Sequence, residues 1–274
     1  MRSLENLLAR LLLCPGPMTR LRSVCVALVT LVTACAAAPV DEIAPFIDTS
    51  TSDGKADGHS IKLLKLDRRR LDVAEPSDLT MVNGALYTIS DAHSQIYEVS
   101  PAGDRLSSLD IQGRDLEALG FDQDRGQFLV ADESRARIWH IDPDGSRHDP
   151  IELPDAEDGN SGIEGLTFGA NGHLFVAKEK DPARIFELGA DGSEIQRTRI
   201  DFASDLSALT FNPEDGHLYA LSDEEHTLYR LEHDLDVDRA WRLPIEHPEG
   251  IAFDGPILYV VSDSEERIYM FAML

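Results

Sequence analysis

Cysteine is scarce in this chain, and acidic residues outnumber basic ones. The three cysteines among 274 residues are Cys14, Cys25 and Cys35, so nothing beyond residue 35 can form a disulfide. Their position also excludes thiolate metal sites and thiol nucleophiles from the rest of the chain. Lysine and arginine total 25 against 50 aspartates and glutamates, which gives a formal net charge of −25. Such a charge repels nucleic acid phosphates, so we expect no nucleic acid partner.

Sequence motifs of three well-known catalytic classes are missing as well. The chain has no Ser-His-Asp phrase, no glycine-rich loop suited to phosphates and no HExxH zinc motif. Ser77 and Ser207 are isolated serines outside any nucleophile elbow. These absences argue against a serine hydrolase, a nucleotide-binding loop enzyme or a zinc protease.

Residues 1–34 have the plan of a secretory signal. Two arginines precede an apolar run, Val24 to Ala34, which is too short to span a bilayer. The run ends in 32-VTAC-35, which resembles a bacterial lipobox. We therefore predict that residues 1–34 are removed and that Cys35 is lipidated. The alternative is an ordinary signal peptide, cleaved after one of the following alanines and leaving no anchor. Met18 is a second candidate start.

Residues 35–60 are rich in Ser, Thr, Asp, Gly and Ala. This composition predicts a flexible acidic tether between the anchor and a folded domain. The chain thus divides into a signal segment (1–34), a lipidated cysteine with its tether (35–60) and a domain (61–274). We expect contact with a membrane through the lipid alone.

One phrase recurs five times in residues 61–274. Its copies are 76-PSDLTM-81, 114-RDLEALGF-121, 162-GIEGLTF-168, 204-SDLSALTF-211 and 248-PEGIAF-253. A second phrase, such as 218-LYALSDEEHTLYRL-231, follows each copy. Apolar and polar residues alternate, and turns such as Asn83-Gly84 interrupt them, which predicts short antiparallel strands. Four strands in a repeat of about 40–47 residues are typical of a β-propeller blade.

The predicted fold is all-β, a five-bladed β-propeller. The last repeat stops after its third strand at Leu274, and 61-IKLLKLDRRRLDVA-74 belongs to no repeat. We predict that residues 61–74 supply the missing outer strand of the last blade. This closure would join the two ends of the domain and leave the ring without a gap.

Aligning the repeats places oxygen-bearing residues in two columns. The first column, at the start of each first strand, holds Ser77, Glu117, Glu164, Ser207 and Glu249. The second column, at the end of each second strand, holds Asp91, Glu133, Glu179, Asp223 and Asp263. Because the first and second strands form a hairpin, both columns should meet at one mouth of the ring. Asp115 and Asp205, two residues before the first column, are expected to add to its rim, as are the hydroxyl groups of Ser77 and Ser207.

Carboxylates crowded at one mouth repel one another unless a cation or a proton relieves them. Oxygen ligands without histidine or cysteine suit Ca²⁺ better than zinc or copper. We therefore predict a calcium site among the eight acids of the two columns. The alternative is that these residues cap turns through their own backbone. The acids of the second column could also pair with nearby cations, and Lys178 beside Glu179 indicates that one blade could neutralise its own acid.

The repeats resemble the SdiA-regulated, or YjiK-like, proteins. The similarity rests on 113-GRDLEALGFDQDRGQFLVADESRARIWHI-141, 162-GIEGLTFGANGHLFVAKEKDPARIFEL-188 and 205-DLSALTFNPEDGHLYALSDEEHTLYRL-231, in that order. It implies a five-bladed propeller exported in Gram-negative bacteria, with a calcium site and no established catalytic activity. The positions that match its most distinctive phrases are Glu117, Glu133, Glu164 and Glu179. The lipobox departs from the family pattern and predicts a lipid anchor in the cell envelope, on the periplasmic side or at the outer membrane.

Three functions remain open at this point. The first is a non-enzymatic calcium-binding propeller that binds a small ligand or an envelope protein at its acidic mouth. The second is a calcium-dependent hydrolase of lactones or phosphate esters, with His93, His226 or His247 as candidate bases. The third is a scaffold whose blade faces bind partners and whose ion is structural.

Overall fold

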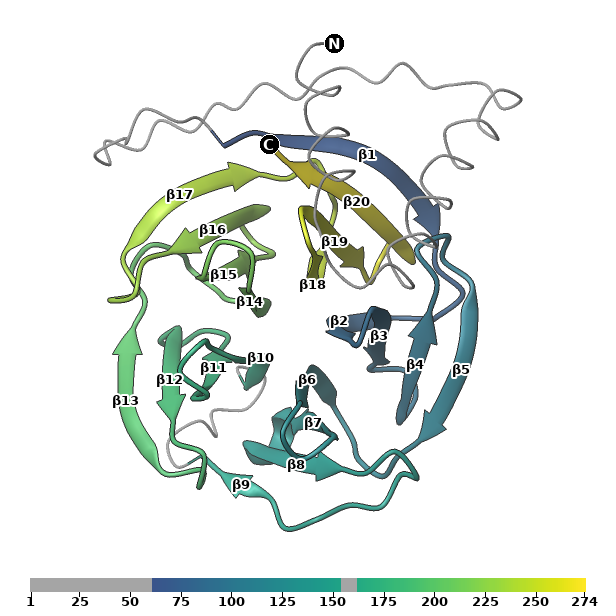
Figure 1. Cartoon of the computed structure of the whole chain (residues 1–274), viewed down its shortest axis with the longest axis vertical. Helices are drawn as coiled ribbons and strands as arrows, with labels where there is room; N and C mark the ends of the chain where they lie inside the picture. Colours follow the sequence, from purple (N-terminus) through teal and green to yellow (C-terminus); the bar gives the residue numbers. More distant parts are fainter. Residues whose placement is uncertain (1–60, 154–161) are drawn as a thin grey trace, which may run out of the picture. The chain divides into compact units, whose positions relative to one another are not determined.

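A computed structural model describes residues 61–153 and 162–274 of the protein. Its strands form five four-stranded antiparallel sheets, which stand around a common centre as the blades of a propeller (Figure 1). The predictions of an all-β fold and of five blades are confirmed. The predicted signal segment, Cys35 and the tether lie outside the described residues. The described part contains no helix long and apolar enough to cross a membrane.

Each blade runs from an inner strand to an outer strand. Blades 1 and 2 comprise β2 (Pro76–Val82), β3 (Ala85–Ser90), β4 (Gln95–Val99), β5 (Arg105–Asp110), β6 (Leu116–Asp122), β7 (Gln127–Asp132), β8 (Arg137–Ile141) and β9 (Ile151–Glu152). Blades 3 and 4 comprise β10 (Ile163–Phe168), β11 (Leu174–Lys178), β12 (Arg184–Leu188), β13 (Glu194–Arg199), β14 (Ala208–Asn212), β15 (His217–Ser222), β16 (Thr227–Leu231) and β17 (Val237–Arg242). Blade 5 comprises β18 (Pro248–Asp254), β19 (Ile257–Ser262), β20 (Arg267–Met273) and β1 (Leu63–Arg70). A short 3₁₀ turn, η2 (Glu133–Arg135), follows β7.

The two ends of the domain meet in blade 5, as predicted. β1 pairs antiparallel with β20, in a register that runs from Leu63 opposite Met273 to Arg70 opposite Arg267. The Lys62 N–H donates to the carbonyl of Leu274 at 2.8 Å, and the Leu274 N–H donates back to Lys62 at 2.9 Å. The first strand of the domain therefore completes the last blade and closes the ring (Figure 1).

Apolar side chains hold neighbouring blades together. The period-two alternation of each strand turns one set of side chains toward the blade before and one toward the blade after. Five apolar clusters result, each shared by two adjacent blades. Between blades 4 and 5, for example, Tyr219 packs with Phe253, their ring centroids 4.7 Å apart. This continuous packing fixes the blades without a disulfide in the domain.

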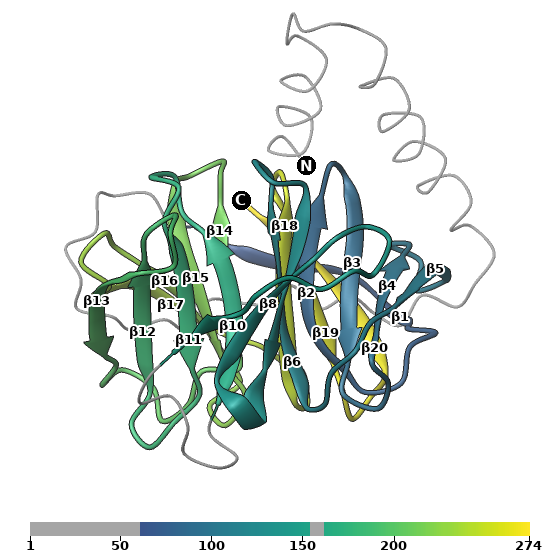
Figure 2. The ribbon, with the colours of Figure 1, turned by 90° about the horizontal axis from the view of Figure 1, so that it is seen from below.

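The hairpin geometry sets which strand ends share a face. Within each blade the inner strand runs antiparallel to its neighbour. The start of the inner strand therefore lies beside the end of the second strand, at one rim of the disc. Figure 2 shows the strands running between the two rims. The two columns of polar residues are consequently carried to the same rim.

Candidate functional site

The residues of the first column lie at the start of the inner strands, mostly in β-bulges. In β6, Leu116 pairs with Asp132 and Leu119 with Val130, so Glu117 and Ala118 together face one residue of β7. Similar register shifts occur in β2, β10 and β18, at Ser77, Glu164 and Glu249. Ser207 directly precedes β14, where no register shift interrupts the pairing. A bulge re-aims the extra side chain, which here turns it toward the axis.

The residues of the second column follow directly on the second strand of each blade. Each comes after a fully buried polar residue; these are Ser90, Asp132, Lys178, Ser222 and Ser262. The Ser90 hydroxyl donates to the carbonyl of Ala74 at 2.6 Å, and the Ser262 hydroxyl donates to that of Glu246. These bonds fix the ends of β3 and β19 to the segment before the inner strand. The next side chain, Asp91 or Asp263, then emerges at the mouth.

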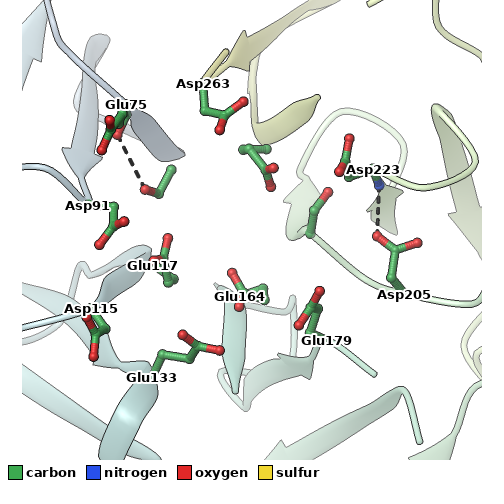
Figure 3. A pocket seen from close by; sticks show the side chains of 13 residues that line it. Glu75, Asp91, Asp115, Glu117, Glu133, Glu164, Glu179, Asp205, Asp223 and Asp263 are labelled. Atoms are coloured by element: carbon green, nitrogen blue, oxygen red, sulfur yellow. Dashed lines mark hydrogen bonds between the residues drawn. The ribbon is translucent and has the colours of Figure 1, made fainter. Parts of the chain in front are cut away.

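Both columns line one cavity of about 570 Å³ at the axis (Figure 3). The thirteen described residues that line it comprise eleven acids and two serines, and none of these thirteen is a lysine or an arginine. They include the eight acids predicted as metal ligands and the four predicted rim residues, Asp115, Asp205, Ser77 and Ser207. The structure thus brings all twelve together; that they bind an ion stays a prediction.

Glu75 is the lining residue that the sequence analysis missed. It lies two residues before Ser77, the same offset that places Asp115 before Glu117. Glu75 and Asp115 share a left-handed backbone, with φ of 45° and 49°. His247 has the same offset from Glu249 and a φ of 44°. Extending the same offset to blade 1 would have found Glu75.

Crowding and burial favour the protonated forms of the innermost acids. Burial, and after it the Asp91 carboxylate, raises the pKa of Glu117 to about 8. Burial, followed by Asp223 and Asp263, raises the pKa of Glu249 to about 9. Burial and four neighbouring glutamates hold the pKa of Glu164 well above its usual range. Without a cation, these three acids therefore keep their protons to a higher pH than ordinary glutamates do.

Some cavity acids already have partners. Asp205 accepts hydrogen bonds from the Ser222 hydroxyl and, at 2.9 Å, from the Asp223 N–H, and it is 2% exposed. It holds the loop after β15 in place, and Figure 3 shows this contact. Glu133 Oε1 accepts the N–H of Gly162 at 2.9 Å, which ties blade 2 to blade 3. In each of these residues at least one carboxylate oxygen is therefore already engaged in a hydrogen bond that stabilises the fold.

The cation beside Glu179 is Lys180. Lys180 Nζ lies 2.6 Å from Glu179 Oε1 and 3.8 Å from Glu224. Lys178 is fully buried and donates to the carbonyl of Lys180. Arg135 pairs with Asp132 at 2.8 Å rather than with an acid of the second column. The expectation that blade 3 neutralises its own acid therefore holds through Lys180.

The three candidate bases occupy different places. His247 Nδ1 lies 3.2 Å from Asp223 Oδ2, at the mouth. His226 Nδ1 lies 2.6 Å from the carbonyl of Ile245, a backbone contact that fixes its ring. His93 is exposed in the loop between β3 and β4. Of the three, His247 is the one that reaches the cavity acids.

Within residues 61–153 and 162–274, two groups of ligand atoms are close enough to share a cation. Within each group the atoms lie within 4.8 Å of one another; the groups are Glu133, Glu164 and Glu179, and Asp223, His247 and Glu249. The first consists of carboxylates alone and fits a hard divalent ion. The second adds an imidazole and is less selective. The residues present therefore fit a divalent cation.

The sequence model of the SdiA-regulated proteins matches residues 64–272, nearly the whole described domain. The chain belongs to the SdiA-regulated family. In this family member the repeated phrases and the acidic mouth lie within the matched residues, as does nearly the whole ring.

Two solved structures of low sequence identity are similar to this chain in fold. Glutaminyl cyclase from Myxococcus xanthus aligns with a TM-score of 0.61 and 11% identity, over 77% of this chain and 97% of the cyclase. Virginiamycin B lyase from Staphylococcus aureus aligns with a TM-score of 0.50 and 16% identity, over 73% of this chain. The alignment spans 66% of the length of the lyase. At these identities the likeness concerns the fold alone.

Proposed function

We propose that this SdiA-regulated protein is a non-enzymatic, calcium-binding propeller of the cell envelope. Its acidic mouth would hold Ca²⁺ and present it to a small ligand or an envelope protein. The observation that carries the proposal is the convergence of eleven acids on one cavity, with no lysine or arginine among the lining residues in the described part of the chain. Such a cavity stabilises a cation far better than it stabilises an apolar or anionic ligand alone.

Calcium suits the donor atoms of this mouth. It takes 6–8 oxygens in a flexible arrangement, whereas Mg²⁺ demands a small regular octahedron and keeps several waters. Glu117, Glu164 and Glu249 extend from three different blades, and the carboxylates of the second column surround them. The proposed ligands are drawn from the eight acids of the two columns, which are Glu117, Glu133, Glu164, Glu179, Glu249, Asp91, Asp223 and Asp263.

Attachment to a membrane is proposed through Cys35. The lipobox 32-VTAC-35 and the acidic tether support a lipid anchor that leaves the propeller outside the bilayer. Replacing Cys35 by serine should abolish labelling by a fatty acid and release the protein into the soluble fraction. An unchanged membrane fraction would contradict the anchor and leave the cation site untouched.

A calcium-dependent hydrolase is the second candidate, and one contact favours it. The Asp223–His247 pair at 3.2 Å could serve as an oriented base beside a bound ion. Turnover of lactones or phosphate esters that requires both Ca²⁺ and His247 would establish this function. Calcium binding without turnover would favour the non-enzymatic protein.

Calorimetric titration of the chelator-stripped protein with Ca²⁺ tests the main proposal. The melting temperature should rise with the ratio of free Ca²⁺ to Kd, because the ion binds the folded state. Mg²⁺ at the same concentration should have a smaller effect. No heat of binding and no thermal shift, with either ion, would overturn the proposal.

A further inference from the structure

Asp78 breaks the pattern of the five inner strands. The residue after the first column is small in the other four blades; these residues are Ala118, Gly165, Ala208 and Gly250. In blades 3 and 5 the neighbouring inner strand lies too close for any side chain at this position. A Cβ on Gly165 would lie 2.4 Å from the backbone nitrogen of Leu209, and one on Gly250 would lie 2.6 Å from Asp78 Cα. Blade 1 nevertheless carries a carboxyl group at this position.

The Asp78 carboxyl group joins the inner strands of blades 1 and 2. Asp78 Oδ2 accepts the N–H of Leu119 in β6 at 2.8 Å, and Oδ1 accepts the N–H of Leu79 in its own strand at 2.7 Å. The residue is 1% exposed. Both of its oxygens are therefore used by backbone donors.

Both donors lie within two residues after a bulge. Leu119 re-enters the pairing with β7 after the bulge that contains Glu117. Asp78 and Leu79 re-enter the pairing with β3 after the bulge at Ser77. One carboxyl group thus braces the two adjacent bulges that turn Ser77 and Glu117 toward the cavity.

Stability alone does not explain an acid at this place. A buried carboxyl group is costly even when it is hydrogen-bonded. Burial holds the pKa of Asp78 well above its usual range, against the effect of the two N–H donors. Glu117 and Glu249 raise it further. Four blades fold with alanine or glycine at this position. The acid in blade 1 is therefore better explained by the two bulges that it holds in place than by stability.

We propose that Asp78 is a positioning residue of the cation site, which fixes the bulge of Glu117 from the neighbouring blade. The inference rests on the proposed cation binding at the mouth. Asp78 itself does not touch the ion. Its effect on binding passes through the direction of the Glu117 side chain.

Calcium titration of the full chain carrying Asp78→Ala tests the inference. This substitution installs the residue that blades 2 and 4 already have. We expect the Kd for Ca²⁺ to rise about tenfold, the lower end of the range for residues that orient metal ligands. Asp78→Asn keeps one acceptor oxygen in the same volume, so its Kd for Ca²⁺ should lie between those of the unmodified protein and Asp78→Ala. If the alanine variant does not fold, Asp78→Asn replaces it in the test.

A matched control separates positioning from loss of stability. Asp122 ends β6 at the opposite rim, is 4% exposed and accepts the N–H groups of Asp124 and Arg125, each at 2.9 Å. Asp122→Ala should lower the melting temperature of the metal-free protein and leave the Kd unchanged. A tenfold rise in Kd in this variant would attribute the effect of Asp78 to stability and overturn the proposal.

A double-mutant cycle with Glu117→Gln tests whether Asp78 affects calcium binding through the Glu117 side chain. If Asp78 acts through Glu117, adding Asp78→Ala to Glu117→Gln should change the Kd by less than about twofold. An equal loss in both backgrounds would indicate a general electrostatic effect and overturn the proposal. An unchanged Kd in Asp78→Ala, with binding by the unmodified protein, overturns this inference alone. Failure of the unmodified protein to bind Ca²⁺ overturns the proposed function and this inference together.

Discussion

Lys180 Nζ lies 2.6 Å from Glu179 Oε1, so one acid of the mouth already has a cation of its own. The Lys180 side chain is 36% exposed and that of Glu179 is 18% exposed. An ion that takes Glu179 Oε1 therefore competes with Lys180, whose side chain is partly exposed. The charge of this acid is thus already partly balanced within blade 3.

Removing this lysine should strengthen cation binding. In Lys180→Gln, Glu179 no longer has an ion-pair partner to give up, and we expect the Kd for Ca²⁺ to fall about two- to fivefold, as for a partly exposed ion pair. Isothermal titration measures the change. Arg197→Gln, on the outer strand of the same blade, removes the same charge far from the mouth and should leave the Kd as it is. Weaker binding in Lys180→Gln would show that Lys180 assists the site.

Glu164→Gln should have opposite effects on the metal-free and calcium-loaded protein. Burial and neighbouring glutamates disfavour the charge of Glu164, and its pKa lies well above its usual range. The amide removes that repulsion, so the melting temperature in EGTA should rise. The Kd for Ca²⁺ should increase at least about tenfold, because a central ligand is lost. Thermal shift assays with EGTA and with Ca²⁺ measure both effects.

The exposed Glu152 provides the control for this substitution. It lies on β9 and pairs with Arg137 at 2.9 Å, with 55% of its side chain exposed. Glu152→Gln should change neither the Kd nor the gain in melting temperature with calcium. A loss of calcium binding in both variants would point to net charge rather than to the mouth.

The stability of the metal-free protein should fall as the pH rises. The folded pKa values of Glu117 and Glu249, about 8 and about 9, lie above the ordinary value of 4.5, so the folded state holds their protons more tightly than the unfolded state. The stability that these groups contribute is full below about pH 4.5 and is lost as the pH rises through 8 and 9. Melting curves in EGTA across this range should show the decline, and saturating Ca²⁺ should reduce it. A metal-free melting temperature that rises from pH 5 to about 9 would contradict the assignment.

The first strand should be essential to the ring. β1 makes seven residue pairs with β20, and Leu63 belongs to the apolar cluster between blades 4 and 5. A chain that starts at residue 61 should keep its cooperative unfolding transition. A chain that starts at residue 71 leaves the edge of β20 open and should aggregate or unfold without a sharp transition. Circular dichroism melts compare the two, and equal melting temperatures would exclude a role of β1 in closure.

The sequence by itself determined the architecture of the domain and the membership of the mouth. The alternation of apolar and polar residues within each repeat is compatible with β-strands and not with helices. The segment at residues 61–74 belongs to no repeat, and the open edge of the last blade was the one place where it could pair. Repetition also fixed the two columns, because residues at equivalent positions of equivalent blades must lie at equivalent places around the axis. Glu75 was within reach of the same argument, two residues before Ser77.

Only the tertiary structure decided what each oxygen does. Asp205 braces a loop, Glu133 ties blade 2 to Gly162, and Asp78 bonds to Leu119, 41 residues further along the chain. The two partners of each bond lie in different blades or in separate segments of one blade. The spacing of residues in the sequence therefore does not predict these bonds. Whether a carboxyl group is available to an ion depends on burial and on such bonds, and both exist only once the ring has closed.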